Sequence, residues 1–226
     1  MDPLKELVKI YGKDDPQFVW SQCDSLNQLF YCNIEFLKNN LTESFYHYGE
    51  LVIDSKPLVD DLIELHCRGI FTVNGQGSLI NHNVFIDKKN IFCDTEQKPF
   101  LSFFMKKKHM CQLIDYFNEK KYTDDKIYYN ITLPTNENIS NLEETVYTVT
   151  RERIYNNADD LVHAIWNDYS SLKTDFTFRT YAFIFNIYPE IKKIINEKYI
   201  HVDLTTYKYG SNIQIEKELI NFIKTI

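Results

Sequence analysis

Short apolar runs alternate with segments of helical period along most of the chain, and this alternation limits the possible folds. The clearest example is residues 57–73, where a helix ends at Gly69 and the extended run IFTV follows at once. A helix or a sheet buries its apolar face only against another layer of structure. The sequence therefore predicts an α/β or α+β fold, a single domain over 1–226, in which helices cover a mixed β-sheet.

Periodicity and capping residues predict where the helices lie. Residues 1–50 form an N-terminal helical part with one or two helices, broken at Asp15-Pro16 and Asp24-Ser25. Ser55 is the expected N-cap of the helix over 57–68, and Asn157 that of another over 157–169. The remaining helices are expected over 106–119, over 189–199, and from a cap near Ser211 to the end of the chain.

Alternating and β-branched runs predict the strands. After residues 70–73 we expect a turn at Asn74-Gly75, since this dipeptide is a common hairpin signal. A hairpin follows, with its turn at Lys88-Lys89. Further extended segments are expected over 99–105, 126–133, 145–155, 176–188 (one strand or a bent pair) and 200–208, and a polar loop over 134–144.

Charge and cysteine content restrict the class of protein. The net charge of −7 over 226 residues does not favour binding to nucleic-acid phosphates. Lys106–Lys108 is the one basic run, and we interpret it as a solvated face. No apolar run is long enough for a membrane span, and the 5 cysteines form no CxxC pair, which is typical of reduced thiols. We expect a soluble cytoplasmic protein without a membrane partner.

The residue usage bears on origin. Phe, Tyr, Ile, Asn and Lys are abundant, whereas Gly and Pro number only 6 each. Such usage is typical of AT-rich genomes, which large DNA viruses of protists have. The sequence thus suggests an accessory protein of such a virus, acting in the host cytoplasm.

The polar stretch TVNGQG after a buried strand is the first candidate site. Loops at strand ends commonly carry binding residues, because the sheet fixes the backbone while the loop presents side chains. Thr72, Asn74 and Gln76 are therefore candidate ligand-binding residues. A structural interpretation stays open, in which Thr72 and Gln76 only hold the loop through hydrogen bonds to the backbone.

This stretch also resembles a known pattern. LHCRGIFTVNGQGS is similar to the motif L-x-x-x-G-(I/F)-x-T-x-x-S-Q of a little-studied bacterial family of unknown function, known mainly from actinobacteria, with giant viruses as a second expected source. The matching positions are Leu65, Gly69, Ile70, Thr72 and Gln76, with Trp20, Leu26 and Leu29 upstream and Gln97 and Lys98 downstream.

The resemblance covers about the first half of the chain and is not complete. Gly75 stands where the family has Ser, and Gly77 where it has Pro. It implies that Thr72, Gln76 and Gln97 belong to one pocket, and it implies no reaction, cofactor or partner.

An enzymatic alternative comes from Asp87, Glu96 and Lys98. A nuclease of the PD-(D/E)xK type binds Mg²⁺ through an Asp and a Glu and places a Lys near the attacking water, on adjacent strands of an αβββαβ core. The expected order of elements over residues 57–133 resembles that core, but Pro99 follows the Lys. His66 and Cys67 are helix neighbours and point about 100° apart, so they do not form a catalytic pair.

Arg179 lies inside the aromatic run FTFRTYAFIF and must reach water, an acid or an anion. Arg151 and Arg153 alternate in the same way on the preceding expected strand. The arginines can form an anion-binding site, or they can be charges paired with acidic side chains. The leading hypothesis is a ligand-binding or host-interaction site at loop 72–77 that also includes Gln97 and Arg179. Its partner is a protein or small molecule, and the metal-dependent nuclease is the alternative.

Overall fold

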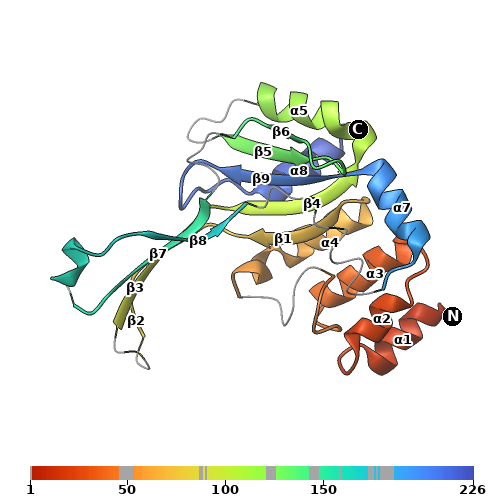
Figure 1. The fold of residues 1–226 in the computed structure, drawn as a ribbon, viewed down its shortest axis with the longest axis horizontal. Coiled ribbons are helices and arrows are strands. Elements are labelled where there is room, and N and C mark those ends of the chain that lie inside the picture. The colour runs from red at the N-terminus through yellow and green to blue at the C-terminus, as the bar shows by residue number, and fades with distance from the viewer. Residues whose placement is uncertain are drawn as a thin grey trace.

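The strands of the computed structural model form two antiparallel sheets (Figure 1). The structure describes residues 2–45, 53–86, 89, 91–120, 126–142, 148–157, 159–172, 176, 178 and 186–226. Sheet A has the order β1-β4-β9-β5-β6, and sheet B has the order β2-β3-β7-β8. The expected α+β class is confirmed, but the expected mixed sheet is not: the pairs that the described strands make are all antiparallel.

Sheet A forms the body of the molecule, while sheet B extends from it as an arm (Figure 1). The strands of sheet A are β1 (Phe71–Gln76), β4 (Phe100–Lys106), β9 (Tyr199–Thr206), β5 (Ile127–Thr132) and β6 (Asn138–Ser140). Those of sheet B are β2 (Leu79–Ile86), β3 (Ile91–Gln97), β7 (Thr148–Tyr155) and β8 (Asn167–Ser171).

The α-helices pack around sheet A (Figure 1). At the far end of the arm, the described residues form one 3₁₀ turn and no α-helix. The α-helices are α1 (Pro3–Tyr11), α2 (Pro16–Ser21), α3 (Leu26–Leu37), α4 (Val59–Cys67), α5 (Met110–Glu119), α7 (Pro189–Lys198) and α8 (Ile215–Ile223), with 3₁₀ turns η1 (Ile53–Leu58), η2 (Lys107–His109) and η4 (Asp160–Val162). No helix in the described ranges is long and apolar enough to cross a bilayer.

The N-terminal helices begin at side chains that accept hydrogen bonds from their first turns. Asp2, Asp15 and Ser25 accept from the backbone N–H of residues two or three positions later. Both breaks expected in this part of the chain are confirmed. The buried faces of α1, α2 and α3 then join the strands of sheet A in one large apolar core, which includes Trp20, Leu29, Phe71, Phe103 and Leu204.

Asn74-Gly75 is not a turn, which corrects the expectation from the sequence. β1 continues through both residues, and they pair with Ser102 and Leu101 of β4. The register between β1 and β4 shifts at a β-bulge between Thr72 and Asn74. Gly75 has no positive φ, but a Cβ there would lie 3.1 Å from Leu101 Cδ1, so close packing against β4 favours glycine.

Three other expectations were wrong. The described residues within 157–169 form the turn η4 and the start of β8 instead of a helix, because β8 pairs with β7. Residues 138–140 within the expected loop form β6. Neither expected serine cap is made: Ser55 donates its hydroxyl hydrogen to Gly75 O, and Ser211 Oγ accepts from Ile213 N before α8 begins. The run 176–188 lies largely outside the described residues.

The loop after β9 ties the base of the arm to the body. Gly210 N donates to Gln97 O over 3.1 Å, and Gly210 has a φ of 69°. A Cβ at this position would overlap the side chain of Ile80 in β2. Glycine is therefore required twice here, by backbone conformation and by space.

We predict that Gly210→Ala lowers the free energy of unfolding by about 1–3 kcal/mol, because it adds both a strained φ and an overlap with Ile80. In an Ile80→Ala background the overlap is gone, and only the φ cost of about 1–2 kcal/mol should stay. Urea unfolding of the four proteins measures this difference. An equal cost in both backgrounds would contradict the role assigned to Ile80.

Candidate functional site

The candidate site is a group of charged and aromatic side chains on one face of sheet B. Side chains alternate along a strand, so Asp94 and Glu96 of β3 lie on the same face. The register places Glu96 opposite Arg151 and Asp94 opposite Arg153 of β7. Two acids on one strand thus meet two arginines on the next, as cross-strand pairing favours.

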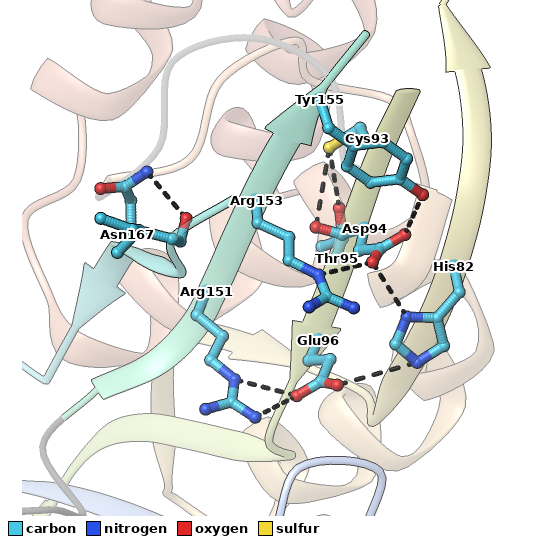
Figure 2. Close-up of polar contacts among 10 residues, drawn as sticks. His82, Cys93, Asp94, Thr95, Glu96, Arg151, Arg153, Tyr155 and Asn167 are labelled. Atoms are coloured by element: carbon cyan, nitrogen blue, oxygen red, sulfur yellow. Dashed lines mark hydrogen bonds and ion pairs between the residues drawn. The ribbon is translucent and has the colours of Figure 1, made fainter. Parts of the chain in front are cut away.

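In both pairs the guanidinium and carboxylate groups are in direct contact (Figure 2). Arg151 donates from Nε and Nη2 to Glu96 Oε2, over 2.9 and 2.5 Å. Arg153 donates from Nε to Asp94 Oδ2 over 2.7 Å, and Tyr155 donates its hydroxyl hydrogen to Asp94 Oδ1 over 2.9 Å. Asp94 is almost fully buried, so its charge is compensated by these donors in place of water.

His82 reaches the same two carboxylates from β2, as Figure 2 shows. Its Nδ1 lies 3.5 Å from Asp94 Oδ2, and its Nε2 lies 3.7 Å from Glu96 Oε1. A β-bulge between Asn81 and Val84 turns the ring toward the acids. When protonated, His82 would add a third cation beside them.

Aromatic rings cover the guanidinium groups. The Cζ atoms of Arg151 and Arg153 each lie 4.6 Å from the ring of Trp166, and Arg151 Cζ lies 4.2 Å from the ring of Tyr209. Lys98 Nζ lies 4.8 Å from the Tyr209 ring. Such cation–π contacts hold the arginines in one orientation. Burial raises the pKa of Tyr209, against the opposing effect of Arg151, so its hydroxyl stays protonated near neutral pH.

The two arginines behave as partnered charges, one of the two interpretations that the sequence left open. Glu96 and Lys98 belong to this group, but Glu96 is neutralised by Arg151, and Lys98 is buried against aromatic rings. A metal ion bound by Glu96 would have to displace that arginine. The strands expected to form one nuclease core are also divided, with β1 and β4 in sheet A and β2 and β3 in sheet B. Asp87 lies outside the described residues.

Thr72 and Asn74 line a different place. They border a cavity of about 40 Å³ together with Asn33, Ser44 and Ser55. A water molecule needs roughly 10–15 Å³ by such a measure, so the cavity has room for a few waters and not for an organic ligand. Arg179 lies outside the described residues.

Gln76 and Gln97 approach each other at the base of the arm. Gln76 Nε2 donates to Lys98 O over 3.0 Å and to Val149 O over 3.2 Å, and it also contacts Thr150 Oγ1. Gln97 is the register partner of Thr150. The structure therefore brings Gln76 near Gln97, while Thr72 lies in a separate network. The amide of Gln76 is engaged with the protein's own backbone.

A second group, Ser102, His201 and Asp203, is buried within sheet A but lacks the geometry of a catalytic triad. Ser102 Oγ lies 2.8 Å from His201 Nε2 and donates to Asp203 Oδ1 over 2.6 Å. In a triad the carboxylate binds the imidazole nitrogen that faces away from the serine. Here Asp203 binds the serine itself and lies 3.9 Å from the same Nε2. The group is a buried polar network across β4 and β9.

Sequence reasoning missed Trp166, Tyr209, Asp94 and His82. A signal for Asp94 was present, since D-x-E in β3 and R-x-R in β7 have the same spacing and opposite charge. A comparison with models of known protein families finds no match, and a comparison with curated proteins also finds none.

We predict that Arg153→Ala lowers the free energy of unfolding by about 3 kcal/mol, because it leaves the buried Asp94 carboxylate without its cation. The matched control is Arg68→Ala, which removes an exposed pair with Glu64 on α4 and should cost less than about 1 kcal/mol. Chemical denaturation gives both values. Similar losses for the two variants would contradict a structural ion pair at Asp94.

We predict that Gln76→Ala lowers the free energy of unfolding by about 1–3 kcal/mol, because the carbonyls of Lys98 and Val149 lose a buried donor. Gln76→Glu should cost more, since it places an acceptor against those carbonyls. Gln22→Ala, at the exposed C-cap position after α2, is the control. Unchanged stability of Gln76→Ala would restore a ligand-binding role for this side chain.

Proposed function

We propose that the protein is a binding protein whose arm, sheet B, docks onto an apolar surface of a partner protein. The observation that carries the proposal is a set of large apolar side chains exposed on the arm: Val84 (47%), Phe85 (47%), Ile154 (53%), Val162 (81%) and Ile165 (77%). Exposed apolar side chains that gather on one element are typical of interaction sites.

These side chains lie toward the far end of the arm. In the strand register, Val84 and Ile154 flank Cys93 on one face, and Phe85 pairs with Phe92 on the other. This end of the arm, with the turn η4 beside it, lies away from sheet A (Figure 1). An apolar surface at such a place contributes little to the protein's own core and is available to another molecule.

The arm is also held ready for binding. The ion pairs of Asp94 and Glu96 and the stacking of Trp166 on both arginines fix the sheet without help from a partner. A surface ordered in advance binds with less loss of conformational entropy. Trp, Tyr and Arg are also the residues that most often dominate binding energy in protein interfaces.

The edge strand β2 supports a protein partner in particular. Leu79–Ile86 contains no Lys, Asp, Glu or Pro, the residues that usually protect an exposed edge from pairing with other chains. A partner strand can extend a sheet at such an edge, with its side chains beside those of Val84 and Phe85. The proposal keeps the interaction role expected from the sequence but moves it from the loop 72–77 to the arm.

Site-specific photo-crosslinking in the producing cells tests the proposal. A crosslinking amino acid at 162 or 165 should capture one and the same protein, while one at Phe18, an exposed apolar position on α2, should not. The purified partner should then bind the chain at least tenfold more weakly after Val162→Asp and Ile165→Asp together, a loss of about 1.4 kcal/mol. Phe18→Asp should bind normally.

Sedimentation velocity of the purified chain identifies the case in which the partner is a second copy. The wild-type protein would then dimerise, and the double aspartate variant would be a monomer. A monomeric wild-type chain that gives the same crosslinks from 162, 165 and 18 would overturn the proposal.

A further inference from the structure

A basic groove lies on the opposite side of the molecule from the arm. It runs from the start of α3 past the end of α4 and the end of β4 to α7. It consists of two adjoining hollows of about 440 and 670 Å³, which share Leu26, Lys106 and Tyr199 in their walls. Sites for small organic ligands commonly have volumes of roughly 300–1,000 Å³.

Positive charge gathers at this groove in a chain whose net charge is −7. Lys106, Lys107, Lys108 and Lys198 line the larger hollow, where Glu197 is the acid. All four lysines are exposed, and none forms an ion pair with a residue that the structure describes. Glu197 lies 4.0 Å from Lys193, which is outside the groove. The groove therefore has a local positive potential that attracts anions.

Its walls are otherwise largely apolar. Phe30 and Ile34 of α3 line the smaller hollow, and Ile194 of α7 lines the larger one, with Leu26 in both. A lysine rim over an apolar wall matches a ligand with a charged head and an apolar tail. A purely ionic ligand would leave these apolar side chains in contact with water.

One residue that lines the smaller hollow, His66, has a buried ring nitrogen without a hydrogen-bond partner among the described residues. Asn33 Nδ2 lies 3.0 Å from Thr72 O, which only accepts, so this atom is the donor end of the amide. It also lies 2.7 Å from His66 Nε2, which must therefore accept. The single proton of a neutral His66 is thus on Nδ1.

His66 is neutral at physiological pH, because burial lowers its pKa to about 3. Its Nδ1 is buried and has no hydrogen-bond partner among the described residues. A buried donor without an acceptor costs about 1–3 kcal/mol. His66 lines the smaller hollow beside Lys106, but Nδ1 itself is covered. An oxygen atom of a bound anion can supply the missing acceptor once the side chains over this nitrogen move aside.

We propose that the basic groove binds a small anionic amphiphile, with its carboxylate or phosphate head near Lys106 and His66 Nδ1–H and its tail against Leu26 and the apolar wall. This site is separate from the arm, and neither proposal depends on the other. The lysine run, which the sequence alone presents as a solvated face, becomes the source of its charge.

Isothermal titration calorimetry with four probes below their micelle concentrations tests the composition of the site. Dodecanoate and dodecyl phosphate should bind, while dodecanol lacks the head and butanoate lacks the tail, and both should bind at least tenfold more weakly. The ratio between the first two affinities distinguishes a carboxylate site from a phosphate site. Equal binding of dodecanol and dodecanoate would overturn the proposal, and so would the absence of binding by both anions.

Variants that remove equal charge inside and outside the groove test where the ligand binds. Lys106→Gln with Lys198→Gln should weaken dodecanoate binding about tenfold, or 1.4 kcal/mol. Lys192→Gln with Lys217→Gln removes the same charge outside the groove and should leave the affinity unchanged. Because these lysines are not core residues, loss of folding does not confuse the result. Equal affinities of the two double variants would contradict a site in this groove.

The imidazole of His66 gives a direct readout in the wild-type protein. ¹⁵N-edited NMR should show the proton on Nδ1 before and after addition of dodecanoate, with the Nδ1–H resonance moving downfield as it gains an acceptor. A purely structural histidine would not respond. An unchanged Nδ1–H resonance in a protein that has bound dodecanoate would remove His66 from the site.

Discussion

The connection between β3 and β4 is the point on which the two-sheet arrangement depends. The chain passes from sheet B to sheet A within Gln97–Pro99, and separate segments bind the backbone there. Lys98 N donates to Val149 O of β7, Lys98 O accepts from Gln76 of β1, and Gln97 O accepts from Gly210 N. Pro99 O accepts from the hydroxyl of Thr205 in β9. These hydrogen bonds pair backbone N–H and C=O groups that lie outside the strand pairing of both sheets, and they fix the direction of the arm.

The two sheets are stabilised in different ways. Sheet A belongs to a large apolar core with the helices, whereas the described apolar residues at the base of sheet B form a small cluster of Phe100, Val149 and Leu172. Further along the arm, the ordering contacts are the ion pairs of Asp94 and Glu96 and the rings on Arg151 and Arg153. Polar pairs of this kind contribute more to a defined geometry than to stability, since desolvation offsets much of their attraction.

Sequence reasoning placed most elements but not their pairing. The pairing of β2 with β3, the helix stop at Gly69 and the closing helices follow from local signals, and the structure confirms them. Lys88, in the turn expected between β2 and β3, lies outside the described residues. It failed at Asn74-Gly75 and at 157–169, where pairing with β4 and β7 overrides the local preference. The sequence predicted four residues of the candidate site as functional or charged-pair candidates: Glu96, Lys98, Arg151 and Arg153. Trp166 was assigned to a helix, and Tyr209 joins the group only through the fold.

On the arm, Phe85 packs on Phe92, which stacks on Tyr155, whereas Val162 and Ile165 are left largely exposed. A side chain exposed in the connection between β7 and β8, such as Val162 or Ile165, gains little burial from folding. The ion pairs beside it already order the strands, so these residues are not needed to hold the sheet together. Exposed apolar area also favours unwanted association, most of all beside an uncharged edge such as β2. A surface that adds this risk without a matching gain in burial supports the proposed docking of a partner on the arm.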